Sequence, residues 1–342
     1  MSRQTSRRQS LSEISFTTDV NASLWLDKFI EGHDTEETRE ISAETCKQKL
    51  ISELVKVKLP EVYRAKFASW KSVLEEVGAK CRVLKVDDRM IVGLGGESVL
   101  ETSIVLHRVY GVPFIPGSAL KGLAASYAHR KLGGKWKRGG EFHNLVFGSQ
   151  DFAGLVTFHD ALLVPDGIET LPLHREIMTV HHAGYYGDGS EAPADWDSPN
   201  PIPFVSASGR YLVALSCEEG IERILERTFE ILALALAEDG IGAKTSSGYG
   251  RACFERSEAE IMAEKENSQV ENFINRLTAL RNQDVAGQIN AFYQEWKNSS
   301  LSTASKKRMA QAIIDKVRAA GREKQSKEKA WYQELCAFNK QD

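Results

Sequence analysis

The sequence has few cysteines, no long apolar run and almost no net charge. Its five cysteines lie far apart and form no CxxC pair, which argues against a disulfide framework or a structural zinc site and favours a reducing cytoplasm. The longest aliphatic run, 231–237, is far shorter than the ~20 residues of a membrane helix, so we expect no membrane partner. The 44 basic and 47 acidic residues leave a formal charge of −3, so nucleic-acid contact would need a local patch.

Changes in composition along the 342 residues predict three parts. Residues 1–20 are rich in Ser, Arg and Thr and predict a mobile arm; the arginine pair at 7–8 precedes no apolar segment, so we expect no export. Apolar residues at helical spacing over 40–80, interrupted by Pro60, predict two helices and an N-terminal part of 1–85. Helical spacing from residue 257 predicts a C-terminal helical extension of 257–342.

The central part, 86–256, alternates predicted strands and helices. Helices are expected at 120–132 and 222–237, and strands at 89–95, 104–106, 152–164, 210–217 and 250–254. This order predicts an α+β fold of the ferredoxin-like (RRM-like) kind. Six of the nine prolines fall within 165–209, which is too long for an ordinary connection, so we predict a functional insertion there.

The first chemical motif is Ile115-Pro-Gly-Ser-Ala-Leu-Lys-Gly122. Gly117 is expected to shape a turn and Ser118 to cap the helix that follows, whose unpaired N–H groups and positive dipole end favour an anion. Lys121 adds a cation one turn into that helix. The motif therefore suits a phosphate, although a capped helix with an exposed lysine accounts for the same residues equally well.

The second motif is the glycine-rich segment 240–251, GIGAKTSSGYGR. Its four glycines allow backbone N–H groups to approach a phosphate chain, while Lys244 and Arg251 supply charge and Tyr249 a stacking face. The Ala-Lys-Thr triplet does not make a P-loop, because the segment leaves a predicted helix and enters a predicted strand. A plain connection between helix and strand is the alternative interpretation.

Two other patterns invite different chemistry. Ser118-Ala-Leu-Lys121 and Lys244-Thr-Ser partly match a serine acyl-enzyme, but no S-D-N element lies between them. The histidine pair in HHAGYYGDG matches no metal-ligand spacing, so we predict neither a metal nor a cofactor. Packing against a neighbouring subunit would explain this loop as well as RNA does. The residues expected to stack on bases are His181, His182, Tyr185 and Tyr186.

Three segments in a fixed order resemble a known family. They read RMIVGLGGESVLETSIVLHRVYGVPFIPGSALKG, VFGSQDFAGLVTFHDALLV and GIGAKTSSGYGR, and they extend from about residue 89 to 254. In this order and spacing they are similar to RAMP-superfamily subunits of type III-B (Cmr) CRISPR effector complexes, and most of all to the family of sixth subunits. The resemblance implies a ferredoxin-like RAMP core, a glycine-rich loop before its last strand and a thumb-like insertion.

The resemblance also implies a non-catalytic, crRNA-binding structural subunit that caps the filament near the 3′ end of the guide. Its partners would be crRNA, target RNA, backbone RAMP subunits and the first Cmr subunit. One rival is a RAMP-type endoribonuclease that uses Asp87, Asp88 or Asp160, and another is an assembly cap with little RNA contact. We expect the two motifs to share one face and to contact the guide through Gly117, Ser118, Lys121, Gly242, Lys244, Thr245, Ser246, Gly248, Tyr249 and Arg251.

Two features depart from the family. The helix after Lys121 continues GLAASYA, without the arginine that relatives often carry there, so phosphate contact is expected to be weaker. The helical region from 257 exceeds what the family requires, and its last stretch, 297–342, holds eleven lysines and arginines against five acids. That stretch could face RNA or form a solvated helix surface.

Overall fold

The structure is a computed structural model, and it describes residues 11, 13–32, 45–100, 102–165, 171–180, 192, 194, 200–256 and 258–340. The chain divides into two compact units, Met1–Glu255 and Arg256–Asp342. None of the described helices combines the length and the apolar character needed to cross a membrane.

The first unit is built around a six-stranded antiparallel sheet. Its main path runs β2-β4-β7-β1-β8, and β3 pairs with β7. The strands are β1 (Lys80–Val86), β2 (Phe114–Ile115), β3 (Thr157–Phe158), β4 (Ala161–Leu163), β7 (Arg210–Ser216) and β8 (Ala252–Phe254). The predicted α+β class is confirmed. The ferredoxin-like topology stays a prediction, with which the order β4-β7-β1-β8 and its antiparallel pairing agree.

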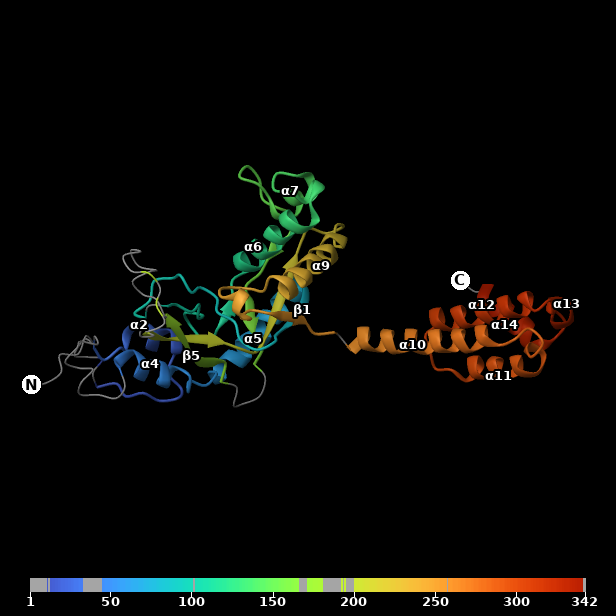
Figure 1. The fold of residues 1–342 in the computed structure, drawn as a ribbon, viewed down its shortest axis with the longest axis horizontal. Coiled ribbons are helices and arrows are strands. Elements are labelled where there is room, and N and C mark those ends of the chain that lie inside the picture. Colours follow the sequence, from blue (N-terminus) through green and yellow to red (C-terminus); the bar gives the residue numbers. More distant parts are fainter. Residues whose placement is uncertain are drawn as a thin grey trace, which may run out of the picture. The chain divides into compact units, whose positions relative to one another are not determined.

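Helices cover both faces of this sheet. On one face, Val213 and Leu215 of β7 belong to the main core, which they share with α6 (Gly117–Tyr127) and α9 (Arg223–Glu238). Helices α6 and α9 lie side by side there (Figure 1). On the other face, Ala214 packs with α5 (Glu61–Glu76), because successive strand residues point to opposite faces. An RRM module stacks RNA bases on an open sheet face, and here α5 covers part of that face.

The described part of the predicted insertion forms a hairpin rather than a loop. Strands β5 (Leu173–Val180) and β6 (Asn200–Ala207) pair over eight positions, from Leu173 opposite Ala207 to Val180 opposite Asn200. Pro201 and Pro203 lie in β6. Since proline has no N–H, both fit at positions where a donor to β5 is not needed. Helix α4 (Cys46–Leu54) packs on this hairpin, and α2 (Ala22–Lys28) packs on α4.

A short helical segment continues from α6. It consists of the π-helical turn η1 (Ala128–Leu132), the 3₁₀ turn η2 (Gly134–Trp136) and α7 (Glu141–Phe147). Gly133 and Gly134 have φ angles of 65° and 51°, a left-handed conformation that favours glycine and ends the helix. As a result, the predicted helix at 120–132 begins earlier, at Gly117, and changes its winding after Tyr127.

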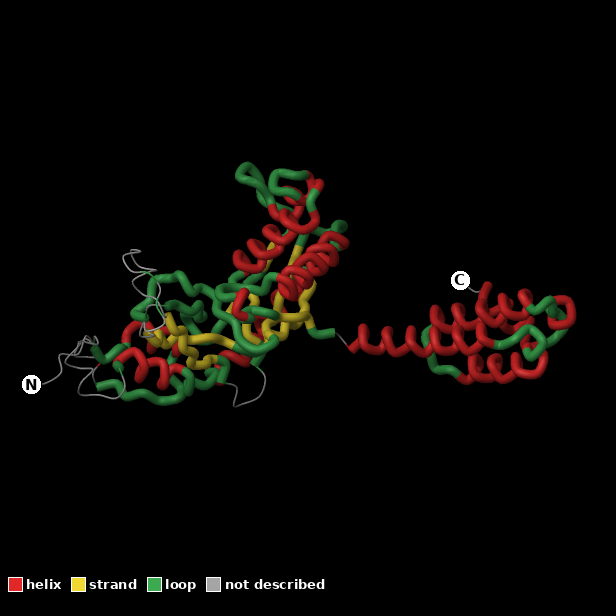
Figure 2. The backbone as a smooth tube through the Cα atoms, viewed as in Figure 1, coloured by secondary structure: helices red, strands yellow, loops and turns green. Residues whose placement is uncertain are grey.

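The second unit contains only helices among its described elements (Figure 2). Its core holds Phe273, Phe292 and Ile313, which are buried in one cluster. The indole of Trp296 donates a hydrogen bond of 3.0 Å to the carbonyl of Lys306, which joins two helices. The helices are α10 (Glu258–Ala279), α11 (Val285–Asn298), α12 (Thr303–Ala319), α13 (Glu323–Ser326) and α14 (Ala330–Lys340).

Several local predictions differ from the structure. The strand predicted at 89–95 is wrong: that segment makes single bridges at Met90 and Ile91, and the strand before it is β1. The strand predicted at 104–106 is reduced to one bridge at Leu106. Strand β1 also crosses the predicted boundary between 85 and 86, whereas the second unit begins at Arg256, next to the predicted start of the extension.

Candidate nucleic-acid interface

The glycine-rich loop, which we define as residues 240–251, packs against the segment 89–92. The N–H of Ala243 donates to the carbonyl of Ile91 at 2.8 Å, and the N–H of Gly250 donates to that of Arg89 at 2.7 Å. Gly242 lies opposite Ile91 with φ +90°, and a Cβ there would come within 2.2 Å of the Ile91 oxygen. Only glycine permits this close approach. The first and last family segments are therefore in direct contact.

The tip of the glycine-rich loop presents a row of unpaired donors. Lys244 has φ 57°, and the 3₁₀ turn η3 (Thr245–Ser247) follows it. Among the described residues, the backbone N–H groups at 242, 244, 245 and 246 have no protein acceptor, and Gly242 and Ser246 are exposed. Successive free N–H groups around a left-handed residue form a nest, which suits an anion such as a phosphate. We call these four groups the N–H row.

The two cations of the loop have different surroundings. The ammonium of Lys244 contacts the sulfur of Met178 at 2.7 Å and lies 5.9 Å from the centre of the Phe204 ring. It forms no ion pair within the part of the chain that the structure describes, so its charge is available to a ligand. Arg251 instead donates to the carbonyl of Ala237 at 2.8 Å, near the C-terminus of α9. A cation there also stabilises the helix dipole, so Arg251 has a structural role.

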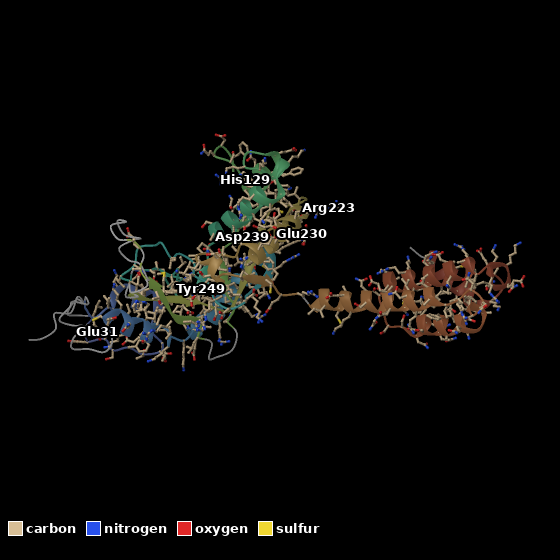
Figure 3. The ribbon with its side chains drawn as sticks, viewed as in Figure 1. Glu31, His129, Arg223, Glu230, Asp239 and Tyr249 are labelled. Atoms are coloured by element: carbon tan, nitrogen blue, oxygen red, sulfur yellow. The ribbon has the colours of Figure 1, made fainter. Side chains whose placement is uncertain are left out.

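Tyr249 is anchored by the hairpin. Its ring lies 6.1 Å from that of Phe204, at the junction of the hairpin and the sheet (Figure 3). Burial raises the pKa of Tyr249, and the nearby carboxylate of Glu176, which its hydroxyl contacts, raises that pKa further. Glu176 in turn pairs with Arg89 and accepts a hydrogen bond of 3.0 Å from Ser206. Tyr249 therefore holds the loop in place, and only part of its ring remains for stacking.

The first motif forms a poorer anion site than predicted. Helix α6 begins at Gly117 after Pro116, so the prediction that Ser118 caps it is wrong; Ser118 lies in the first turn and is exposed. The N–H of Gly117 donates to Oδ1 of Asp160 at 2.8 Å. That carboxylate already satisfies the positive end of the helix. Lys121 is partly buried and has no ion-pair partner in the described part of the chain.

The two motifs lie at opposite edges of the sheet. Helix α6 follows β2 at one edge, and the glycine-rich loop precedes β8 at the other, with β4, β7 and β1 between them. Four spacings of ~4.8 Å place these edges roughly 19 Å apart. The motifs thus belong to different edges of the sheet, and an RNA strand that contacted both would have to extend between them. The predicted stacking residues His181, His182, Tyr185 and Tyr186 lie outside the described residues.

Sequence reasoning missed the residues that support the loop from the hairpin. Met178, Glu176 and Phe204 contact Lys244 or Tyr249 but belong to the insertion, whose pairing with the loop no local pattern reveals. Arg89 carried a signal, because it opens the first family segment. The interface is thus assembled from three regions that are distant in sequence.

A second candidate surface is an apolar groove between α9 and the segment 132–146. We call it the helical groove; its volume is about 570 Å³. Its lining includes four exposed apolar side chains, Leu132, Phe142, Leu145 and Leu234. Arg223 and Glu230 project from α9 at its rim (Figure 3). Large apolar side chains that gather at an exposed groove are typical of a surface that contacts another protein.

Comparison with known proteins identifies the family. A model of the RAMP superfamily matches residues 83–255. The chain belongs to the RAMP superfamily. The resemblance predicted from the three segments is thus confirmed.

Two curated relatives carry the same subunit name. The chain is 31% identical over 257 residues to the CRISPR system Cmr subunit Cmr6 of Pyrococcus furiosus, and the alignment covers 57% of this chain and 75% of that protein. It is 28% identical over 181 residues to the Cmr6 subunit of Saccharolobus solfataricus, and this alignment covers 51% of this chain and 56% of that protein. Both names agree with the resemblance to sixth Cmr subunits that the sequence predicted.

A chain of a solved structure has a similar fold. A chain of the type III-B Cmr-β complex bound to cognate target RNA aligns with 65% of this chain and 74% of its own length, at 22% identity and a TM-score of 0.50. The family match ends at residue 255, which is also the last residue of the first unit. The N–H row and the helical groove therefore lie in the RAMP part of the chain, and the second unit lies outside it.

Proposed function

We propose that this chain is a subunit of a type III-B CRISPR complex and that it binds the guide RNA through the RNA backbone. Membership of the RAMP superfamily and the 31% identity to a Cmr6 subunit support this assignment. The proposal places the chain at the guide's 3′ end, where it would cap the filament. Its partners there would be crRNA, target RNA, the backbone RAMP subunits and the first Cmr subunit. We propose no catalytic residue.

The N–H row beside Lys244 is the observation that carries the RNA-binding role. Backbone N–H groups and lysines bind phosphate oxygens, which are identical in every guide sequence. Such contacts leave the bases free to pair with a target. Because Asp160 occupies the start of α6, we assign the main contact to the glycine-rich loop and a weaker one to Lys121. The sequence specificity of the complex would then come from the RNA alone.

The helical groove supports the proposed protein contacts. Its apolar side chains would be covered by a neighbouring subunit. Among its lining residues, the acid Glu230 is already paired with Arg227, whereas Arg223 has no ion pair with any described residue. The excess charge at the rim is therefore positive. We propose that a neighbouring subunit docks an apolar segment flanked by acidic residues here.

The test is retention of crRNA by the assembled complex with Lys244→Met, alone and combined with Lys121→Met. Methionine keeps a long apolar side chain and removes the charge. We expect weaker retention, by the same factor for guides of different sequence. The slope of log affinity against log salt should fall by about 0.7 for each lost phosphate contact. Lys71→Met is the matched control, since Lys71 lies exposed on α5 beside Glu75.

Three results would contradict the proposal. A loss that depends on guide sequence would mean that bases, and not phosphates, are read. An equal loss with Lys71→Met would mean that only the overall charge matters. Cleavage of labelled RNA by the purified chain with Mg²⁺, abolished by Asp87→Asn, Asp88→Asn or Asp160→Asn, would favour the endoribonuclease instead.

A further inference from the structure

The second unit contains a pocket that lies outside the RAMP match. Its volume is about 290 Å³, and it lies between α11 and the segment that leads from α12 to α14. Val285, Ile289 and Val317 are buried and form its apolar floor. Its polar and aromatic lining is Asn290, Arg322, Gln325, Ser326, Lys329 and Trp331. We call it the C-terminal pocket.

The charge of the C-terminal pocket is positive. Arg322 and Lys329 line it, and neither forms an ion pair with any residue that the structure describes. The neighbouring acid Glu323 is already engaged: it accepts from Nε of Arg318 at 3.2 Å and from the hydroxyl of Tyr332 at 3.4 Å. No acidic side chain is among the lining residues. The pocket therefore favours an anionic ligand.

Ser326 adds a hydroxyl group to the lining of the C-terminal pocket. It lines the pocket, its exposed fraction is only 6%, and its hydroxyl has no hydrogen-bond partner among the described residues. The hydroxyl oxygen is not among the fully enclosed polar atoms of the chain, so it is accessible and free to hydrogen-bond to a ligand in the pocket. The exposed side chains of Asn290 and Gln325 add amide groups that bond to no described residue and can reach a ligand. The pocket thus combines cations with uncharged hydrogen-bonding groups.

Trp331 gives the C-terminal pocket an aromatic wall. Its ring is partly buried and stands edge-on to Tyr332, with ring centres 5.6 Å apart at 88°. An indole face stacks well on a nucleobase, and base stacking on aromatic side chains tolerates any sequence. The volume of about 290 Å³ is at the lower end of small-molecule sites, which suits one nucleotide and not a larger ligand.

We propose that the C-terminal pocket binds one nucleotide, with its phosphate on Arg322 and Lys329 and its base on Trp331. Ser326, Asn290 and Gln325 would hydrogen-bond to the sugar or the base. The recognised chemistry is a nucleoside phosphate, supplied either by a single strand of RNA or by a free nucleotide. The proposal does not rest on the glycine-rich loop, because the pocket belongs to the other unit.

The experiment uses the full chain with a pocket variant and a matched control. The pocket variant is Arg322→Ala with Lys329→Ala. The control is Lys324→Ala with Lys327→Ala, which removes the same charge from the same stretch at exposed residues that do not line the pocket. The probes are a fluorescent oligouridylate that carries 4-thiouridine, and UMP. Circular dichroism melting verifies that the helical unit remains folded in both variants.

We expect thiouridine crosslinks to the peptide that contains Trp331. They should fall about tenfold in the pocket variant and by less than about twofold in the control. If UMP competes with the crosslink, a free nucleotide is sufficient to occupy the pocket. If the crosslink forms and UMP does not compete with it, the ligand is a strand of RNA. Lys244→Met should lower crosslinks to Tyr249 and leave those to Trp331 unchanged, which separates the two sites. Equal losses in the pocket variant and the control, or no crosslink to Trp331, would overturn the proposal.

Discussion

Replacing Gly242 by alanine tests the contact between the glycine-rich loop and Ile91. The two glycines Gly242 and Gly248 have similar φ angles, +90° and +94°, but only at Gly242 does an added Cβ meet an atom, the Ile91 oxygen at 2.2 Å. Left-handed backbone costs an alanine about 1–2 kcal/mol, and this cost applies to both positions. The collision adds about 1–3 kcal/mol at Gly242 alone. Gly248→Ala is therefore an internal reference for Gly242→Ala.

The assay is urea unfolding of the full chain, followed by circular dichroism and tryptophan fluorescence. Because the chain has two units, we expect two transitions, and the transition of the helical unit should not move in either variant. Gly242→Ala should also weaken RNA binding, since the N–H row must move away from Ile91. Gly248→Ala should leave RNA binding nearly intact. Equal destabilisation by the two variants would refute the argument that close approach to Ile91 requires glycine.

Three further predictions concern the first unit. Tyr63→Phe removes a buried hydrogen bond of 2.6 Å to the carbonyl of Leu163 and should lower the unfolding free energy by about 1–3 kcal/mol, measured by urea titration. Burial lowers the pKa of His159, so on acidification the imidazole binds a proton in the unfolded chain before it does so in the folded chain. The folded state should therefore have its full stability above pH ~6.5 and lose stability as the pH falls below that value, and His159→Gln should reduce that loss. Leu145→Glu with Leu234→Glu should weaken co-purification with neighbouring Cmr subunits after co-expression, and unchanged recovery would contradict the docking role of the helical groove. For His159, a stability profile with the same slope in both proteins would argue against the pKa effect.

Regular apolar spacing allowed most helices to be predicted from the sequence. Pro60 and the spacing of Tyr63, Phe67 and Trp70 predict α5, and the aliphatic stripe of 222–237 predicts α9. Strand β1 was not predicted, because Lys80, Arg82 and Lys85 make nearly half of its residues charged. Those charges are tolerated because Glu226 on α9 pairs with both Lys80 and Arg82, a long-range contact that a local pattern cannot contain.

The candidate site was only partly predictable for the same reason. Gly242 signalled a close backbone approach, but its partner there, Ile91, and the carbonyl of Arg89 that accepts from the N–H of Gly250 depend on tertiary pairing. The carboxylate of Asp160 at the start of α6 could not be foreseen from the motif around Ser118. The positive charge of 297–342 could be counted from the sequence. That Arg322, Lys329 and Trp331 line one pocket could not be predicted, because their proximity depends on how the helices pack.

The prolines of β6 affect how the hairpin can meet other chains. Pro201 and Pro203 lie two residues apart, so both missing N–H groups fall along the outer edge of the strand. An extended segment from another molecule that tried to add to this edge would find donors absent at alternate positions. The two prolines therefore disfavour strand addition along this edge of β6, and a partner that meets the edge has to bind through side chains instead.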